Sequence, residues 1–456
     1  MTNKPIANSD TNDAKAKKKS TVRHTRAIQR DRSKRQLSTP TDEEMSARVM
    51  ELVHPATLGQ VNYFHQLGLR ERVLTLPVMM ALVLSMIWRQ IGSVGELTRV
   101  VQREALLWAK PQPQLSEKAM ATRLRTLPAE LFWRVLFELL PRLQTRWEQR
   151  QRPLPPELAW AQAHYTQVVA CDGSTLDSLL RKVGLLAKTT TAPLAGRMLA
   201  LLDLCSHLPR RIWYEADADA HDQRFWPSIL SSLQARSLLV FDLGFTNFQV
   251  FAHLTQAQVF FITRAKSNLV YLVEETLLCT PAVHDQLVWI GSGDQRQRVR
   301  LVRLLYQGKW YRYLTNELDA QRLPTPYLVA LYWQRWRIEE AYNTIKRNLG
   351  LAFFWSGAQN AVEMQLAATW ILYTVLIDLT DAIAATLNQR FAALSLEMVY
   401  RSLYFFTQAY HRGEATDVVS FLAAHAAQLG ILKRQRKRDH PSLLVTLFDL
   451  TTAATP

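Results

Sequence analysis

The spacing of apolar and polar residues along the chain changes near residue 165. Before that point, residues 41–150 carry apolar residues at helical intervals, with acidic residues after Thr41 and a capping serine at Ser116 marking helix starts. After it, short apolar runs of β character alternate with helical stretches. A proline-rich linker, residues 151–156, separates the two patterns. The sequence therefore predicts an all-helical region followed by an α/β region.

The α/β region is expected to form a sheet of mixed direction, because three β runs come first and strands then alternate with helices. The predicted strands cover residues 167–171, 197–205, 211–215, 237–241 and 258–263, with helices near 221–233 and 246–254. A further β-rich stretch, residues 268–323, contains runs at 287–290, 298–306 and 310–314. Residues 361–430 return to helical spacing.

One helix, predicted over residues 326–348, concentrates chemistry on a single face. At about 100° per residue, Tyr332, Arg335, Glu339 and Lys346 fall on a stripe roughly 60° wide. One carboxylate among three phosphate-binding groups suits a helix that holds both a metal ion and a nucleic-acid backbone. The alternative is an ordinary solvated face, on which Arg335 and Glu339 form an i,i+4 pair.

Two aspartates mark the ends of predicted strands. Asp172 directly follows the first strand and Asp242 follows a later one, with Gly173 and Gly244 close by. Strand ends in such sheets converge on a crevice, and glycine lets the backbone and a ligand approach closely. With Glu339 they offer three hard oxygen ligands that suit Mg²⁺ or Mn²⁺. Two such ions about 3.5–4 Å apart can activate an attacking oxygen and stabilise the leaving oxygen of a phosphodiester.

Each of these aspartates also has a structural alternative as a turn or cap residue. Further candidates for an acidic site are Asp177, Asp203, Asp217 and Asp219. Asp203 lies inside a predicted strand, where it can point to either face, and Asp217 and Asp219 suit a loop ahead of a helix.

Composition narrows the class of partner. The 456 residues are 48% hydrophobic, enough for large cores, and carry a formal charge of +16 with a pI near 9.9. Half of that charge lies in residues 1–39, which hold eleven Lys or Arg and three Asp, and a second basic cluster follows at residues 433–438. This balance favours nucleic acid or an acidic membrane surface. Residues 1–40 are expected to be a disordered basic arm with DNA affinity, or else a solvated tail without a role.

Two features argue against a secreted or membrane protein. The longest uncharged apolar run, residues 73–88, is shorter than the roughly 20 residues of a spanning helix, and no apolar leader is visible near the start. The three cysteines lack metal-ligand spacing and indicate a reducing compartment. A cytoplasmic protein without a membrane partner is therefore expected.

The spacing of the helical stripe resembles a known signature. Tyr332, Arg335, Glu339 and Lys346 follow the pattern Tyr-x2-Arg-x3-Glu-x6-Lys without gaps. This pattern resembles that of the DDE transposases of the insertion-sequence-four family.

Two further segments carry the same resemblance. Residues 172–174, Asp-Gly-Ser, resemble the family's first catalytic motif, and residues 242–245 followed by 260–266 resemble the second. The resemblance covers roughly residues 165–350. Leu243 departs from the family, in which a basic or polar residue is common at this place. The departure affects the expected contacts of residue 243 and not metal binding by Asp242.

The resemblance implies an α/β fold with a ribonuclease-H-like catalytic core. The expected divisions are a basic arm at 1–40, a helical DNA-end-binding domain at 41–150, the core at 157–267 and 324–385, a β-rich insertion at 268–323, and C-terminal helices at 386–456 with a basic cluster and a candidate role in dimerisation. Within the second division, residues 116–126 and 127–142 have the look of a helix-turn-helix pair.

The same resemblance assigns roles to the site. Asp172, Asp242 and Glu339 would be the catalytic metal ligands and bind two Mg²⁺ ions, for which Mn²⁺ can substitute. Water, and then the freed 3′-hydroxyl, would be the nucleophiles for strand nicking and strand transfer.

The signature's tyrosine, arginine and lysine would contact phosphates at the transposon end. Arg264, on the strand after Asp242, matches a place where the family often has another DNA-contacting arginine. In members that excise through a DNA hairpin, a tryptophan of the insertion stacks on a flipped base. Trp310 is placed for that role, with Trp289 as the alternative, and core packing is the other interpretation of Trp310.

The expected function is that of a bacterial insertion-sequence transposase, cytoplasmic and nucleoid-associated. It would bind terminal inverted repeats of double-stranded DNA, pair them as a homodimer, cut them and join them to target DNA. One alternative is a transposase-derived DNA-binding regulator or inhibitor, against which the complete acidic triad argues. The other is a ribonuclease-H-like nuclease, which would not need the insertion or the basic arms.

Overall fold

The computed structural model describes residues 42–69, 72–176, 196–217, 220–293, 296–351, 354–433 and 443–452, with side chains from residue 47 onward. The chain divides into two compact units, Met1–Leu37 and Ser38–Pro456, and every described residue belongs to the second. The basic arm predicted at residues 1–40 and nearly all of the basic cluster at 433–438 lie outside the described residues.

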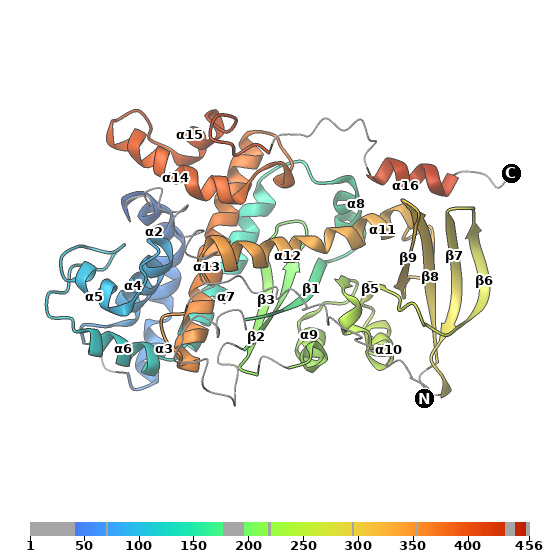
Figure 1. Cartoon of the computed structure of the whole chain (residues 1–456), viewed down its shortest axis with the longest axis horizontal. Coiled ribbons are helices and arrows are strands. Elements are labelled where there is room, and N and C mark those ends of the chain that lie inside the picture. Colours follow the sequence, from blue (N-terminus) through green and yellow to red (C-terminus); the bar gives the residue numbers. More distant parts are fainter. Residues whose placement is uncertain are drawn as a thin grey trace, which may run out of the picture. The chain divides into compact units, whose positions relative to one another are not determined.

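Nine strands in the described part of the chain form one mixed sheet (Figure 1). Their order across the sheet is β3-β2-β1-β4-β5-β9-β8-β7-β6. The strands are β1 (Val168–Thr175), β2 (Arg197–Asp203), β3 (Pro209–Glu215), β4 (Leu238–Phe241), β5 (Phe260–Arg264), β6 (Tyr271–Cys279), β7 (Val283–Ile290), β8 (Gln297–Tyr306) and β9 (Lys309–Thr315). This sheet and its many helices confirm the predicted α/β class with mixed strand direction.

The first five strands establish the frame for the site. β1 pairs antiparallel with β2, and β2 with β3, whereas β4 runs parallel to β1 and β5 runs parallel to β4. Parallel neighbours bring their carboxyl ends to the same edge of a sheet. Residues that follow β4 therefore lie beside the second half of β1, and residues that follow β5 lie at the same edge of the sheet.

The remaining four strands extend the same sheet. β9 pairs antiparallel with β5 and with β8, and β7 and β6 follow outward. The β runs predicted between residues 268 and 323 are confirmed as β7, β8 and β9. β6 has no counterpart among the predicted runs, because this edge strand is exposed over most of its length and lacks an alternating apolar face.

Helices form the N-terminal and C-terminal parts of the described unit and also connect several of the strands (Figure 1). Before β1 they are α2 (Asp42–Gly59), α3 (Val61–Gln66), α4 (Leu76–Trp88), α5 (Val94–Val101), α6 (Glu117–Thr126), α7 (Glu130–Gln149) and α8 (Pro156–His164). Within the α/β region they are η2 (Asp222–Phe225), α9 (Trp226–Ser232), η3 (Leu243–Phe245), α10 (Phe248–Gln256), α11 (Thr325–Gln334), α12 (Trp336–Asn343) and η5 (Thr344–Asn348). The last group is α13 (Gln359–Thr386), η6 (Phe391–Ala393), α14 (Leu396–His411), α15 (Val418–Ala424) and α16 (Leu443–Thr452).

The helix starts follow local chemistry. Ser116 accepts a hydrogen bond from the backbone N–H of Ala119 and caps α6, as the sequence predicts. The long helix predicted from residue 127 begins only at Glu130, because Pro128 occupies the connection after α6.

α13 is the central helix of this unit. It packs against α2, α4, α6, α7, α14 and α15, and the N-terminal helices share one hydrophobic core with it. By length and composition α13 could cross a membrane, but 94% of its most apolar window is buried by the rest of the protein. α13 is therefore a core helix, as predicted for its apolar stretch.

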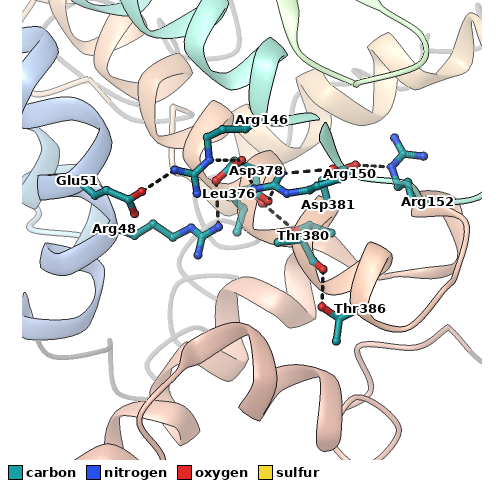
Figure 2. A network of polar contacts seen from close by, with 11 residues as sticks. Arg48, Glu51, Arg146, Arg150, Arg152, Leu376, Asp378, Thr380, Asp381 and Thr386 are labelled. Atoms are coloured by element: carbon teal, nitrogen blue, oxygen red, sulfur yellow. Dashed lines mark hydrogen bonds and ion pairs between the residues drawn. The ribbon is translucent and has the colours of Figure 1, made fainter. Parts of the chain in front are cut away.

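Ion pairs reinforce this packing between helices far apart in the sequence (Figure 2). Asp378, buried on α13, pairs with Arg48 of α2 at 3.0 Å and with Arg150 at 2.7 Å. One turn further along α13, Asp381 pairs with Arg150 and with the buried Arg152. Buried carboxylates are tolerated when they are paired with cations, so these contacts hold α2 and the linker after α7 against α13.

β1 is longer than the sequence pattern predicts. Its parallel pairing with β4 ends at Cys171, but its antiparallel pairing with β2 continues to Thr175. Asp172 therefore lies inside β1 and not after it. The apolar run ends at Cys171 because only the first half of β1 is fully buried, whereas its second half is partly exposed.

Candidate active site

Asp172 and Asp242 occupy equivalent places on neighbouring parallel strands. Cys171 of β1 pairs with Phe241 of β4, so the aspartates that follow them lie side by side at the carboxyl end of β4. Asp172 Oδ1 accepts a hydrogen bond from the backbone N–H of Gly173 at 2.9 Å, and Asp242 is the residue that precedes η3. The two predicted acidic positions are thus brought together by strand pairing.

Three residues of the helical stripe contact or neighbour these aspartates. Tyr332 Oη donates to Asp242 Oδ1 at 3.4 Å. Arg335 donates through Nη1 to Asp172 Oδ2 at 3.0 Å and through Nη2 to Glu339 Oε1 at 2.8 Å. The guanidinium therefore lies between a strand carboxylate and a helix carboxylate.

The fourth residue of the stripe reaches the same strand. Lys346 Nζ donates to Ser174 Oγ and to the Thr175 carbonyl oxygen, both at 2.7 Å. The adjacent Glu340 behaves differently, because its side chain is 60% exposed and pairs with Arg337 at 2.9 Å. The stripe faces the end of β1, and Glu340 lies off that face as the helical spacing predicts.

The helix itself is less regular than predicted. It consists of α11, α12 and η5 in succession, with Arg335 at the junction of the first two. The Arg335 N–H bonds to the Tyr332 carbonyl three residues back, at 3.1 Å, whereas η5 is a π-helix that carries Lys346. Gly350, at φ +76°, follows the end of the helix as expected. Across one tight and one wide turn, Tyr332, Arg335 and Lys346 still reach β1 and the end of β4. Such irregular turns are frequent at functional sites.

Tyr342 anchors this helix to the sheet, a role that the sequence does not reveal. Its buried hydroxyl donates to the Asp172 carbonyl oxygen at 2.6 Å and accepts from the Ala200 N–H at 3.0 Å. The side chain thereby bridges β1 and β2 beneath Asp172. Tyr342 lies three residues after Glu339, so one turn of α12 supplies both the carboxylate and the anchor.

Burial has the largest effect on the ionisable groups of the site. Burial raises the pKa of Asp172 to about 6; the Arg335 guanidinium and the Gly173 N–H oppose that rise, and Asp242 and Glu339 add to it. Burial, with Asp242 nearby, also raises the pKa of Tyr332, so its phenol stays protonated and able to donate. The pKa of Asp172 therefore stays above its usual value even with the Arg335 guanidinium beside it, because burial penalises the charged carboxylate.

A divalent cation is the ligand that three such carboxylates would attract. Their hard oxygens and mutual repulsion fit Mg²⁺ or Mn²⁺ in chemistry. Across the described ranges, however, no group of three or more His, Cys, Asp or Glu side chains is arranged to hold a metal ion. The Arg335 guanidinium pairs with oxygens of both Asp172 and Glu339.

Two other predicted residues lie on neighbouring strands. Arg264 is the last residue of β5, and its guanidinium lies 5.4 Å from the centre of the Tyr311 ring. Trp310 on β9 is 43% exposed, with the Arg303 guanidinium 5.5 Å from its ring centre. Its exposure contradicts the core-packing interpretation. The alternative, Trp289, is half-buried on β7.

The other candidate aspartates do not join the described site. Asp203 ends β2 at the opposite end of β1, where it is buried and pairs with Arg210 at 2.8 Å. Asp217 is exposed and pairs with Arg224 at 3.2 Å. Asp177 and Asp219 lie outside the described residues.

One acidic neighbour of the site escaped the sequence interpretation. Asp222, at the start of η2, pairs with Arg197 of β2 at 2.5 Å. A Cβ atom on Gly173 would come within 2.1 Å of Asp222 Oδ1, and one on Gly244 would lie 3.8 Å from Oδ2. The two glycines therefore leave room for this carboxylate behind the strand ends. At a predicted helix start, Asp222 gives only an ordinary capping signal.

Comparison with known proteins identifies a related family. Residues 194–375 match the family described as Transposase DDE domain, a segment that contains Asp242 and Glu339 and begins after Asp172. A protein of Sinorhizobium fredii with the name "Putative transposase y4zB" is 30% identical over 184 residues. The matched region is 38% of this chain and 49% of that protein, so the chain spans about half the length of the curated relative it matches.

The matched segment and the geometry agree. It runs from just before β2 into α13 and thus contains β4, α11, α12 and η5, with Asp242, Glu339 and the whole stripe, whereas Asp172 on β1 lies outside it. The domain match and the relative together support a transposase family for this chain.

Proposed function

We propose that this chain is the transposase of an insertion sequence, of the insertion-sequence-four type with a Tyr-Arg-Glu-Lys signature. It binds the terminal inverted repeats and catalyses metal-dependent DNA strand cleavage and strand transfer, in a cut-and-paste reaction. The observation that carries the proposal is the meeting of Asp172 and Asp242 with a helix face that presents Tyr332, Arg335 and Glu339. Three hard ligands and several phosphate-binding groups then share one site.

In this proposal Asp172, Asp242 and Glu339 hold two Mg²⁺ ions, which Mn²⁺ can replace. When bound, such ions activate the attacking oxygen and offset charge on the leaving oxygen of a phosphodiester. The chain's own cationic groups position the DNA. Arg335 is suited to pair with a phosphate through two N–H groups. Lys346 would add a single positive charge beside the same DNA backbone.

The strand arrangement supports a ribonuclease-H-like core at residues 157–267 and 324–385. In that core, three antiparallel strands are followed by two strands parallel to the first, the order β3-β2-β1-β4-β5. Strands β6–β9 are then the insertion at residues 268–323, and the exposed Trp310 is available there to stack on a base. Arg264 stands beside the site for a further phosphate contact.

The helices outside the core are assigned to DNA ends and assembly. Residues 41–150, with α6 and α7 in direct succession, are proposed to bind the double-stranded inverted repeats. Residues 1–40, with their eleven basic residues up to position 39, add affinity by neutralising phosphates. Residues 386–456 are proposed to pair two copies into a homodimer on DNA. The protein would act in the bacterial cytoplasm, on the nucleoid.

Strand transfer of pre-cut transposon ends tests the proposal. The full chain is incubated with Mg²⁺, end duplexes and a target plasmid, as wild type and as Glu339→Ala. Joined product is expected from the wild type alone. Equal joining by both proteins would sink the assignment of Glu339. Tight end binding without cleavage by the wild type would favour the regulator, and cleavage without preference for ends would favour a nuclease.

A further inference from the structure

Arg335 is held in an unusual place for a residue that binds DNA. Its side chain is only 8% exposed, and its two terminal nitrogens are committed to the carboxylates of Asp172 and Glu339. Its Nε is buried and has no hydrogen-bond partner among the described residues. The guanidinium therefore forms two ion pairs, but its Nε–H group makes no hydrogen bond.

The oxygens that Arg335 uses are the oxygens that a metal ion would need. Asp172 Oδ2 and Glu339 Oε1 each accept from the guanidinium, at 3.0 and 2.8 Å. A cationic side chain and a divalent cation cannot both occupy the space between these two atoms, since like charges repel and the ion needs direct contact at about 2.0–2.1 Å. The two cations therefore compete.

The surroundings of Arg335 offer a second position for its side chain. The residue lies at the junction between α11 and α12, where the backbone hydrogen bonds change from the α-helical pattern. Next to it, Trp336 is 60% exposed, and the Arg335 guanidinium carbon already lies 5.6 Å from its ring centre. A guanidinium that leaves the carboxylates can move along this exposed ring toward solvent, where a phosphate is accessible.

We propose that Arg335 is an internal counter-ion that keeps divalent cations out of the acidic site until DNA arrives. A DNA phosphate draws the guanidinium away from Asp172 and Glu339, and the freed carboxylates then bind the ions. DNA and metal thereby assist each other's binding, and the coupling runs through one side chain. The inference rests on the proposed function and adds its regulation.

Binding of Mn²⁺ to the DNA-free full chain tests this directly, with free Mn²⁺ measured by electron paramagnetic resonance. Arg335→Gln is expected to bind Mn²⁺ about 5-fold to 100-fold more tightly than the wild type, the usual range of such coupling. Arg337→Gln is the matched control. Arg337 lies on the same helix but pairs with the exposed Glu340, so its loss should leave Mn²⁺ affinity unchanged.

The same titration with a pre-cut transposon-end duplex completes the cycle. DNA should raise the Mn²⁺ affinity of the wild type and of Arg337→Gln, but not that of Arg335→Gln, which has lost the competing cation. Adding Asp172→Asn to Arg335→Gln should abolish the gain in Mn²⁺ affinity. That result would show that the additional Mn²⁺ binds at Asp172. If Arg335→Gln does not fold, Arg335→Lys, which cannot bridge both carboxylates, should show an intermediate gain.

Equal or weaker Mn²⁺ binding by a folded Arg335 variant would overturn the inference. That failure is distinguishable from failure of the proposed function, because wild-type strand transfer is measured on the same preparations. If the wild type carries out strand transfer but the Arg335 variants bind Mn²⁺ no more tightly than the wild type, only the counter-ion role of Arg335 is wrong. An absence of strand transfer and of Mn²⁺ binding, with and without DNA, removes both.

Discussion

At the scale of single residues, adjacent positions on α12 have opposite environments. Glu339 pairs with the buried Arg335 next to Asp172, whereas Glu340 is exposed and pairs with Arg337. Both are glutamates that pair with an arginine, and they differ in the face of α12 on which their side chains lie. This makes the two positions a sensitive pair for testing the face of the helix.

Glu340→Ala is predicted to keep strand-transfer activity within about fivefold of the wild type, because an exposed ion pair contributes about 1 kcal/mol or less. Glu339→Ala should reduce joined product to background. The measurement is the initial rate of end joining for the two variants side by side. Comparable losses in both would show that the helix face has been assigned wrongly.

His207 is a second residue whose environment can be tested. It adopts φ +63°, its ring stacks on Phe391, and it is buried. Burial, and then the charges of Arg152, Arg337 and Lys433, lower its pKa well below the usual 6.5. The imidazole is therefore neutral in the folded protein, whereas the unfolded chain takes up a proton below about pH 6.5.

Since the unfolded state binds the extra proton, His207 removes stability as the pH falls below 6.5. The free energy of unfolding should lose about 1.4 kcal/mol from this group between pH 8 and pH 5.5. Asparagine tolerates positive φ, so His207→Asn should fold. Its free energy of unfolding should fall by about 1.4 kcal/mol less than that of the wild type over the same pH interval. Urea unfolding at both pH values measures it, and an identical decrease in both proteins would contradict the prediction.

At the scale of elements, the start of α11 is fixed by a buried ion pair from the strands. Arg300 of β8 pairs with Asp285 of β7 at 2.5 Å and donates to the Leu323 carbonyl at 2.6 Å and to Thr325 Oγ1 at 3.0 Å. These contacts join strands β7 and β8 to the first turn of the helix that carries the site. Local sequence patterns do not predict this ion pair, because Arg300 is 15 residues from Asp285 and 25 from Thr325.

Arg300→Met is predicted to lower the free energy of unfolding by about 3–5 kcal/mol, because it leaves Asp285 buried without a cation. Replacing both partners, as Arg300→Met with Asp285→Leu, should recover most of the loss. Chemical denaturation of the single and double variants measures both values. A double variant no more stable than the single would show that the hydrogen bonds to α11, and not the charge pair, are decisive.

Element positions were largely predictable because they depend on local patterns. Ser116 caps α6, β4 ends directly before Asp242, and Gly350 ends the helix of the stripe. The breaks within that helix were not predictable, since the turn at Arg335 and the π-helix around Lys346 depend on contacts with β1. The continuation of β1 through Asp172 likewise depends on its partner β2.

At the scale of the whole described unit, α13 joins segments from both ends of the sequence. Its Asp378 pairs with Arg48, Arg146 and Arg150, and the N-terminal helices share its hydrophobic core (Figure 2). The helical region that the sequence sets apart at residues 41–150 is thus packed against a helix of the predicted catalytic core. Cooperative unfolding is the expected consequence.

Asp378→Asn should lower the free energy of unfolding by about 3–5 kcal/mol, because three arginines lose their shared buried partner. The remaining transition should still be a single one for helices and sheet together. Far-ultraviolet circular dichroism and tryptophan fluorescence, followed in one denaturant titration, measure this. Two separated transitions in the variant would contradict a common core.

The sequence by itself determined the order of most helices and strands and the basic character of the chain, and it predicted Asp172, Asp242 and Glu339 as candidate site residues. Periodicity, caps and motif spacing are local properties that need no knowledge of distant partners. Only the tertiary structure decided that Asp172 lies within a strand, that Asp222 stands behind Gly173, and that Arg335 occupies the space between Asp172 and Glu339. Burial and ion pairing depend on which residues meet across the fold, and the contact between Arg335 and Asp172 joins positions 163 residues apart.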